Sequence, residues 1–209
     1  MPGKHVHFDI PSTPSPSFST STLPSSIGPF TPPSAGSYHV PLPSSPGPTQ
    51  VNPLIALSAV PPVEWDVAFP PSSAKPSRGD ITKHALYKPA TTPPQPEIRI
   101  VCSRLPWPIV VKPVGNTAYV TISDVFLCIY ESLRHNLGEH DYYHFTGEQR
   151  RHMSDSYIRR YSRFTGEAAF TEKSKGLKRI DCLGIYGGTR FLGLSSTKEG
   201  PHVWQMHVS

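Results

Sequence analysis

Residues 97–138 constrain the fold of this chain more than any other stretch, because they encode two strands followed by a helix. In 97–102, apolar residues occupy alternate positions, which is the pattern of a strand with one buried face. Trp107, Ile109 and Val111 have the same spacing, and four residues separate the two runs. The sequence therefore predicts an antiparallel β-hairpin.

A capped amphipathic helix is predicted directly after the hairpin. Thr121 and Asp124 have the spacing of a capping box. Val120 and Val125 have the spacing of a hydrophobic staple, and Gly138 is the predicted stop. Apolar residues recur at helical spacing between these signals, so one side of the helix should face the core. They are Ile122, Val125, Phe126, Ile129, Tyr130, Leu133 and Leu137.

Composition divides the chain into a leader and a domain. Pro, Ser and Thr dominate residues 1–50, which contain few aliphatic side chains. Such a segment buries too little apolar surface to offset the entropy lost on ordering, so residues 1–50 are predicted to be disordered. Residues 51–209 have a size common for one hydrophobic core and are predicted to form a single domain.

The predicted fold class is α+β, an antiparallel sheet with two helices on one side, behind the disordered leader. The second helix is expected at 146–164, where Thr146 and Gln149 have the spacing of another capping box. The order of hairpin, helix and further strands resembles a ubiquitin-like β-grasp fold. The further strands are expected at 63–69, 177–183, 190–194 and 202–208, with a tight turn at 184–188.

Three motifs carry a resemblance to a known family. They are Val-Glu-Trp-Asp at 63–66, Leu-Pro-Trp-Pro-Ile at 105–109 and Val-Thr-Ile-Ser-Asp-Val at 120–125. Behind a Pro/Ser-rich leader, this pattern resembles a domain-of-unknown-function family common in mushroom-forming (basidiomycete) fungi. The resemblance covers about residues 50–209. It implies a fungal protein of unknown function, and it carries no catalytic residue.

The leader contains one motif that resembles a docking peptide. Lys4, Val6 and Phe8 match the basic, any, Val, any, Phe pattern of protein phosphatase 1 regulators. Such peptides bind by adding an extended strand to a sheet edge, so the motif predicts docking of a Ser/Thr phosphatase. The alternative is a plain solvated tail. Minimal proline-directed phosphorylation sites lie in the same leader at Thr13, Ser15, Thr31 and Ser45.

Basic side chains concentrate in residues 146–180. This segment has nine Lys or Arg and four Asp or Glu, a difference equal to the net charge of the whole chain, +5. A basic patch of this kind predicts binding to nucleic acid or to an acidic partner, although an ordinary solvated helix face is the favoured alternative. The candidate residues are Arg150, Arg151, Arg159, Arg160 and Arg163. Asp155 is expected to pair locally with two of them.

The sequence predicts no cofactor or metal site and contains no recognisable active site. His140 and His144 have the spacing of two metal ligands on a helix, but the flanking glycines favour an ordinary loop. Cys182 with Asp181 is the best candidate for a nucleophile, yet no motif places a base beside it. An enzymatic function is therefore the third and least favoured hypothesis.

The remaining features concern location and role. No apolar run approaches the length of a membrane span, and the three cysteines are odd in number and widely spaced. These features predict an intracellular protein of the cytoplasm or nucleus with reduced thiols. The first hypothesis for function is a non-enzymatic protein-interaction module with docking and phosphorylation motifs in its leader. The second is binding of nucleic acid or an acidic partner through residues 146–180.

Overall fold

The computed structural model describes residues 48–77 and 82–209, and these belong to one compact unit, Ser44–Ser209. The predictions for the leader concern residues 1–50, and residues 1–47 lie outside the described part of the chain. The docking motif at Lys4, Val6 and Phe8 and the four phosphorylation sites therefore stay predictions.

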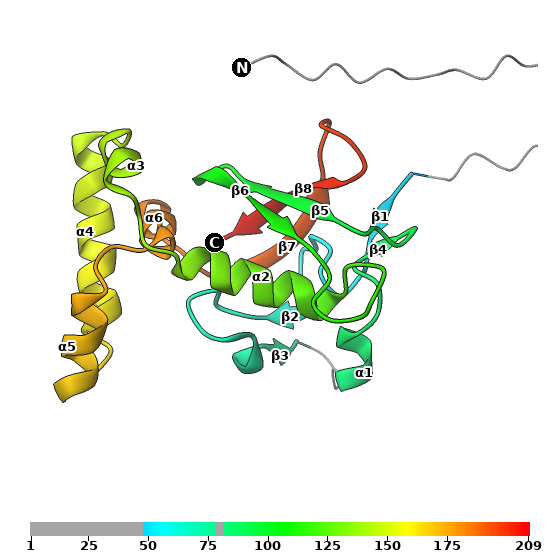
Figure 1. Cartoon of the computed structure of the whole chain (residues 1–209), viewed down its shortest axis with the longest axis horizontal. Helices are drawn as coiled ribbons and strands as arrows, with labels where there is room; N and C mark the ends of the chain where they lie inside the picture. Colours follow the sequence, from blue (N-terminus) through cyan, green and yellow to red (C-terminus); the bar gives the residue numbers. More distant parts are fainter. Residues whose placement is uncertain (1–47, 78–81) are drawn as a thin grey trace, which may run out of the picture. The chain divides into compact units, whose positions relative to one another are not determined.

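A four-stranded sheet forms the centre of the domain, with the strand order β6-β5-β8-β7 (Figure 1). The strands are β5 (Ile98–Cys102), β6 (Leu105–Val111), β7 (Phe191–Ser196) and β8 (Val203–Val208). The pairs β5–β6 and β7–β8 are antiparallel hairpins, whereas β5 and β8 are parallel neighbours in the middle. The α+β class is confirmed, and the sheet has the β-grasp strand order. It differs from the predicted antiparallel sheet in this one parallel pair, because the last strand enters the centre and not an edge.

Helix α2 (Ile122–Arg134) lies against the sheet and supplies much of the core (Figure 1). Its predicted capping box is present: the Thr121 hydroxyl accepts from Asp124 N–H at 3.2 Å, and the Asp124 carboxylate accepts from Thr121 N–H at 2.8 Å. The predicted core face is also confirmed, since Ile122, Val125, Phe126, Ile129 and Leu133 are buried. The helix ends at Arg134, earlier than predicted, because His135 turns to an extended conformation.

The segment before the hairpin covers the outer edge of β7. Trp65 packs between Phe126 and Phe191, with ring centroids at 5.0 and 5.8 Å. Its carbonyl accepts from Phe191 N–H at 2.8 Å, and Leu57 N–H donates to Leu194 at 2.8 Å. The predicted edge strand at 63–69 is therefore reduced to β2 (Val63–Glu64), which pairs with β3 (Lys75–Pro76), and to single bonds with β7.

The approach to the sheet is so close that one residue of β7 must be glycine. Gly193 has φ of +129°, and a Cβ atom there would lie 2.6 Å from the Ala56 backbone. A side chain would therefore push the covering segment away from the sheet. Four short elements complete this part of the fold: β1 (Gln50–Val51), η1 (Pro71–Ser73), α1 (Lys83–Leu86) and β4 (Thr91–Thr92).

A helical insertion, defined as residues 139–186, separates α2 from β7 and lies beside the sheet (Figure 1). Its long helix, α4, packs on α6 and η2 and not on the sheet, so the expectation of two helices on one face of the sheet is wrong for α4. None of the described helices is long and apolar enough to cross a membrane. The elements are α3 (Glu139–Tyr143), α4 (Gly147–Tyr161), α5 (Gly166–Ser174), α6 (Arg179–Leu183) and η2 (Gly184–Tyr186).

A narrow neck joins the two ends of residues 137–177, the stretch that contains α3, α4 and α5. Asn136 and Lys178 form an antiparallel bridge. Leu137 N–H donates to Leu177 at 2.9 Å, and Arg179 N–H donates to His135 at 3.0 Å. The predicted strand at 177–183 is wrong, because only these first residues are extended and α6 follows them. The Asp181 carboxylate stabilises the start of α6 by accepting from Lys178 N–H at 2.8 Å.

Candidate binding sites on the helical insertion

A buried ionic cluster joins α4, α5 and α6, and its centre is Arg160. The guanidinium donates to both Asp181 oxygens at 2.9 Å, to Glu172, and to the Gly176 carbonyl at 2.8 Å. Lys178 is also buried and donates to Glu172 at 2.7 Å. Two buried cations therefore face two buried carboxylates, and the cluster carries no net charge.

The cluster holds Glu172 in the charged form. Burial alone would raise the pKa of Glu172, but hydrogen bonds from Lys178, Lys175 and Arg160 outweigh it and lower the pKa to about 2. Burial likewise acts to lower the pKa of Arg160, and its bonds to Asp181 and Glu172 overcome that effect and raise it. The cluster therefore fixes the relative positions of three helices and is a structural feature.

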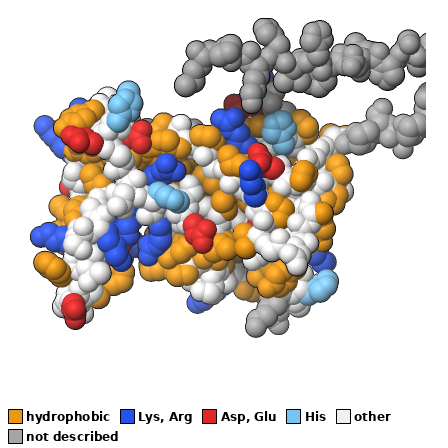
Figure 2. All heavy atoms as spheres, in the orientation of Figure 1, with side chains coloured by type: hydrophobic (Ala, Val, Ile, Leu, Met, Phe, Trp, Pro, Cys, Tyr) orange, Lys and Arg blue, Asp and Glu red, His pale blue; other side chains and the backbone are white. Residues whose placement is uncertain are grey.

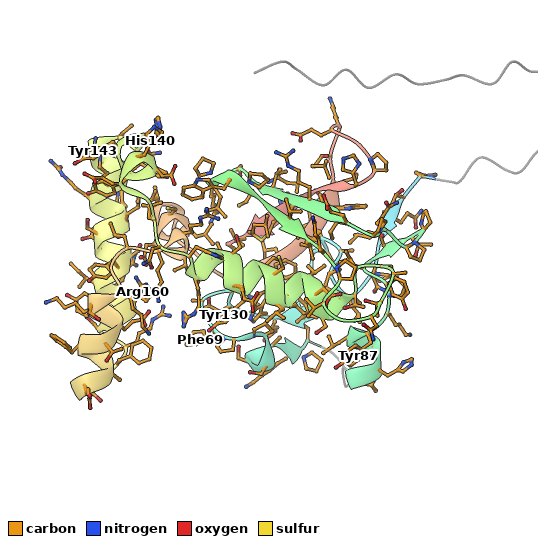
Figure 3. All side chains as sticks on the ribbon, viewed as in Figure 1. Phe69, Tyr87, Tyr130, His140, Tyr143 and Arg160 are labelled. Atoms are coloured by element: carbon orange, nitrogen blue, oxygen red, sulfur yellow. The ribbon has the colours of Figure 1, made fainter. Side chains whose placement is uncertain are left out.

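The five candidate arginines do not form one patch. Arg160 is 8% exposed and faces the rest of the domain (Figure 3), so it is not available to a nucleic-acid backbone. The other four divide between two sides of α4: Arg159 and Arg163 line one cavity, and Arg150 and Arg151 line another. Within the described part of the chain, none of these four has a carboxylate partner within 4 Å, and the expected pairing with Asp155 is absent.

The first candidate site is the tyrosine–arginine corner, defined as Tyr142, Tyr143, Arg150 and Arg151. Three of its members, Tyr142, Arg150 and Arg151, line an open groove of about 330 Å³ where α3 meets the start of α4, and Asp155 is the one carboxylate in the lining. The Arg150 guanidinium lies over both tyrosine rings, at 5.5 and 5.7 Å from their centroids, and its Nε donates to the Phe145 carbonyl at 2.9 Å. Tyr143 is 62% exposed (Figure 3). The corner therefore presents an ordered aromatic and cationic surface to solvent.

The second candidate site is the arginine pocket, a cavity of about 140 Å³ on the other side of α4. Figure 2 shows basic side chains gathered where the insertion meets the rest of the domain. Arg159 and Arg163 form one wall, and the chain at Gly187, Gly188 and Thr189 forms the opposite wall. These glycines belong to the predicted tight turn at 184–188, and no sequence pattern indicates that they face arginines 24 to 29 residues earlier in the chain.

The histidines are brought together without forming a metal site. The rings of His140 and His144 lie 4.5 Å apart between centroids on and just after α3. His140 Nδ1 is 4.0 Å from Asp141. In residues 48–77 and 82–209, no group of three or more His, Cys, Asp or Glu side chains is placed to hold a metal ion.

The candidate nucleophile is placed where it cannot react. Cys182 is fully buried in α6, and burial together with the charge of Asp181 raises its pKa to about 12. The structure does show a pair that the sequence analysis missed, because the Ser195 hydroxyl lies 2.8 Å from His207 Nε2 across β7 and β8. Neither residue lines the two cavities described above, so the pair is a cross-strand contact of the sheet.

Fold and sites together define an α+β domain in which a β-grasp-like sheet carries a helical insertion with two possible binding surfaces. Residues 63–200 match a family of unknown function, DUF6699, and the chain belongs to this family. The match includes the whole insertion, which is therefore part of the family domain. No curated protein and no solved structure matches the chain.

Proposed function

We propose that this protein is a non-enzymatic protein-interaction module whose tyrosine–arginine corner contacts an acidic segment of a partner protein. The observation that carries the proposal is the stacking of Arg150 on Tyr142 and Tyr143 beside an open groove. Tyrosine and arginine are the residue types that most often dominate binding energy at protein interfaces. The phosphatase-docking motif in the leader is a second contact in this proposal, and a fungal origin is part of the same expectation.

The corner is ordered before any partner arrives. The capping box of α4 holds its first turn, since Thr146 and Gln149 each accept a hydrogen bond from the other's N–H. Arg150 is fixed by the Phe145 carbonyl and by the two rings. A partner would therefore lose little additional side-chain entropy on binding here, which favours affinity.

The charge of the insertion favours an acidic partner. Residues 146–180 contain nine basic and four acidic side chains, of which Arg160, Lys178 and Glu172 belong to the buried cluster. Seven basic and three acidic side chains are left for the surface. Nucleic acid is the alternative ligand for this charge, but the separation of the arginines onto two sides of α4 supports a small contact more than a continuous phosphate track.

The two edge strands of the sheet, β6 and β7, have few free backbone groups with which a partner strand could pair. β6 carries Pro106 and Pro108, which have no N–H to donate to an added strand. β7 is already bonded to the segment that contains Leu57 and Trp65. Contact through side chains of the insertion is therefore favoured over strand addition to this domain.

The test compares two matched pairs of substitutions in the tagged full chain. Tyr143→Ser with Arg151→Gln alters the corner, whereas Tyr87→Ser with Lys88→Gln alters an exposed Tyr and Lys elsewhere, Tyr87 being 66% exposed. Proteins captured from the native cells should be lost with the first pair and kept with the second, and the acidic segment of such a protein should bind the purified domain in a salt-sensitive way. Equal capture by both variants would refute the proposal.

A further inference from the structure

We propose that the arginine pocket binds the phosphate group of a phosphorylated Ser or Thr side chain. The pocket lies on the opposite side of α4 from the tyrosine–arginine corner, so this inference goes beyond the proposed function and does not depend on it. It rests on the placement of Arg159 and Arg163, on the uncompensated charge there, on unpartnered donors in the facing wall and on the size of the cavity.

Both arginines are positioned by neighbours that leave their charge uncompensated. Arg159 donates from Nη2 to the Ser156 hydroxyl at 3.1 Å, and Arg163 lies over the Phe69 ring at 5.3 Å from its centroid. Neither has a carboxylate within 4 Å among the described residues. Guanidinium groups bind phosphate oxygens with two parallel hydrogen bonds, so a phosphate between them would complete the site.

The other charged groups of the pocket cancel one another. Asp181 also lines the cavity, but its two oxygens accept from Arg160, and one of them accepts from Lys178 N–H as well. Arg160 is in turn shared with Glu172. Arg159 and Arg163 therefore decide the sign of the field in the pocket, which favours a dianion such as a phosphate monoester.

The facing wall contains backbone and hydroxyl donors, and its Gly188 lies directly against the Ser209 backbone, where a Cβ atom would be 1.7 Å from the carbonyl. In the part of the chain that the structure describes, the backbone N–H groups of Gly188 and Thr189 and the Thr189 hydroxyl have no hydrogen-bond partner. Gly187 turns the chain with φ of +96°, a conformation that glycine adopts without strain. Gly184 lies directly against α4, because a Cβ atom there would collide with Ser156. This contact keeps the two walls close together.

The size of the cavity limits the ligand to a single small group. At about 140 Å³, it is well below the roughly 300–1,000 Å³ of sites that enclose a whole small molecule. A phosphate group presented by a peptide fits this limit better than a nucleotide. Phe69, 44% exposed beneath the Arg163 guanidinium, is available to a neighbouring apolar residue of such a peptide, for example the proline after a proline-directed site.

The probe is a fluorescent peptide with the sequence of residues 11–20, phosphorylated at Ser15 and titrated with the full chain. Binding should require the phosphate, and Arg159→Gln and Arg163→Gln should each weaken it about tenfold, as expected for losing a charge-assisted hydrogen bond. The control is Arg99→Gln, an exposed arginine of β5 that lines neither cavity, which should leave the affinity unchanged. Both arginines also lie near the end of α4, where cations stabilise a helix, so the melting temperature of each variant is measured.

Each alternative outcome overturns the proposal in a different way. If the unphosphorylated peptide binds equally well, no phosphate is recognised. If inorganic phosphate raises the melting temperature through Arg159 and Arg163 but the phosphopeptide does not bind, the ligand is a free anion. If a single-stranded oligonucleotide binds more tightly than the phosphopeptide and needs the same two arginines, the pocket serves nucleic acid. If Arg99→Gln weakens binding of the phosphopeptide as much as the pocket variants do, the effect is one of general charge.

Discussion

Replacing Glu172 by Gln should destabilise the domain strongly at neutral pH and much less in acid. Glu172 accepts from Arg160, Lys175 and Lys178 inside the cluster, and its side chain is 6% exposed. Glutamine has nearly the same shape but no charge. The substitution therefore leaves two buried cations, Arg160 and Lys178, to share the single carboxylate of Asp181.

The magnitude follows from the pKa of Glu172. A pKa lowered from 4.5 to about 2 corresponds to roughly 3 kcal/mol of stability, at 1.36 kcal/mol per pKa unit. Because the folded pKa is the lower one, this stability is fully present above pH 4.5 and is lost as pH falls through about 2. The leftover buried cations add to the cost at pH 7, since breaking a buried ion pair typically costs about 3–5 kcal/mol.

The assay is urea unfolding of wild type and variant at pH 7 and again at pH 2.5. We expect a loss of about 3 kcal/mol or more at pH 7 and a clearly smaller difference in acid. Glu167→Gln is the matched control, because Glu167 is an exposed carboxylate on the same helix without an ion pair among the described residues. A difference below 1 kcal/mol at pH 7, or the same difference at both pH values, would refute the assignment of the cluster as a structural clamp.

Three further predictions concern the core, the leader and the charge. Ile129→Ala removes a fully buried side chain from α2 and should cost about 2–5 kcal/mol in urea unfolding, and a loss near zero would mean that the helix face is misplaced. Val6→Ala with Phe8→Ala should abolish capture of a Ser/Thr phosphatase without changing the melting temperature, and capture by the double variant would rule out docking. Generic nucleic acid should bind only weakly at low salt, and Arg150→Gln with Arg151→Gln should weaken it only modestly. Tight binding that survives high salt would contradict this.

Local signals made part of the fold predictable. The capping boxes at Thr121 and Thr146 are formed by residues three positions apart, so the sequence contains the whole interaction. The hairpin and the core face of α2 follow from periodicity for the same reason. The strand predicted at 177–183 is wrong because so short an apolar run has the same pattern in a strand and in a helix, and the cap formed by Asp181 favours the helix.

The candidate sites depend on contacts that sequence spacing does not encode. Arg160 meets Glu172 and Asp181 across 12 and 21 residues, so no local pattern distinguishes this buried arginine from the exposed arginines of α4. Arg159 and Gly188 lie on opposite walls of the arginine pocket, and they come together only when α6 folds back against α4. The central, parallel position of β8 was equally hidden, because it depends on the path of the chain after the insertion.

The neck of the insertion has an evolutionary consequence. Asn136 and Lys178 are adjacent, so the neck, and not residues 137–177 between them, sets the distance between the two ends of that stretch. Residues can then be added to or removed from the loops joining α3, α4 and α5 without shifting the strands, because the extra loop-closure entropy grows only slowly with length. Relatives should therefore vary in length mainly within residues 137–177, which the neck encloses. A new recognition surface can evolve in that stretch while the two hairpins of the sheet stay unchanged.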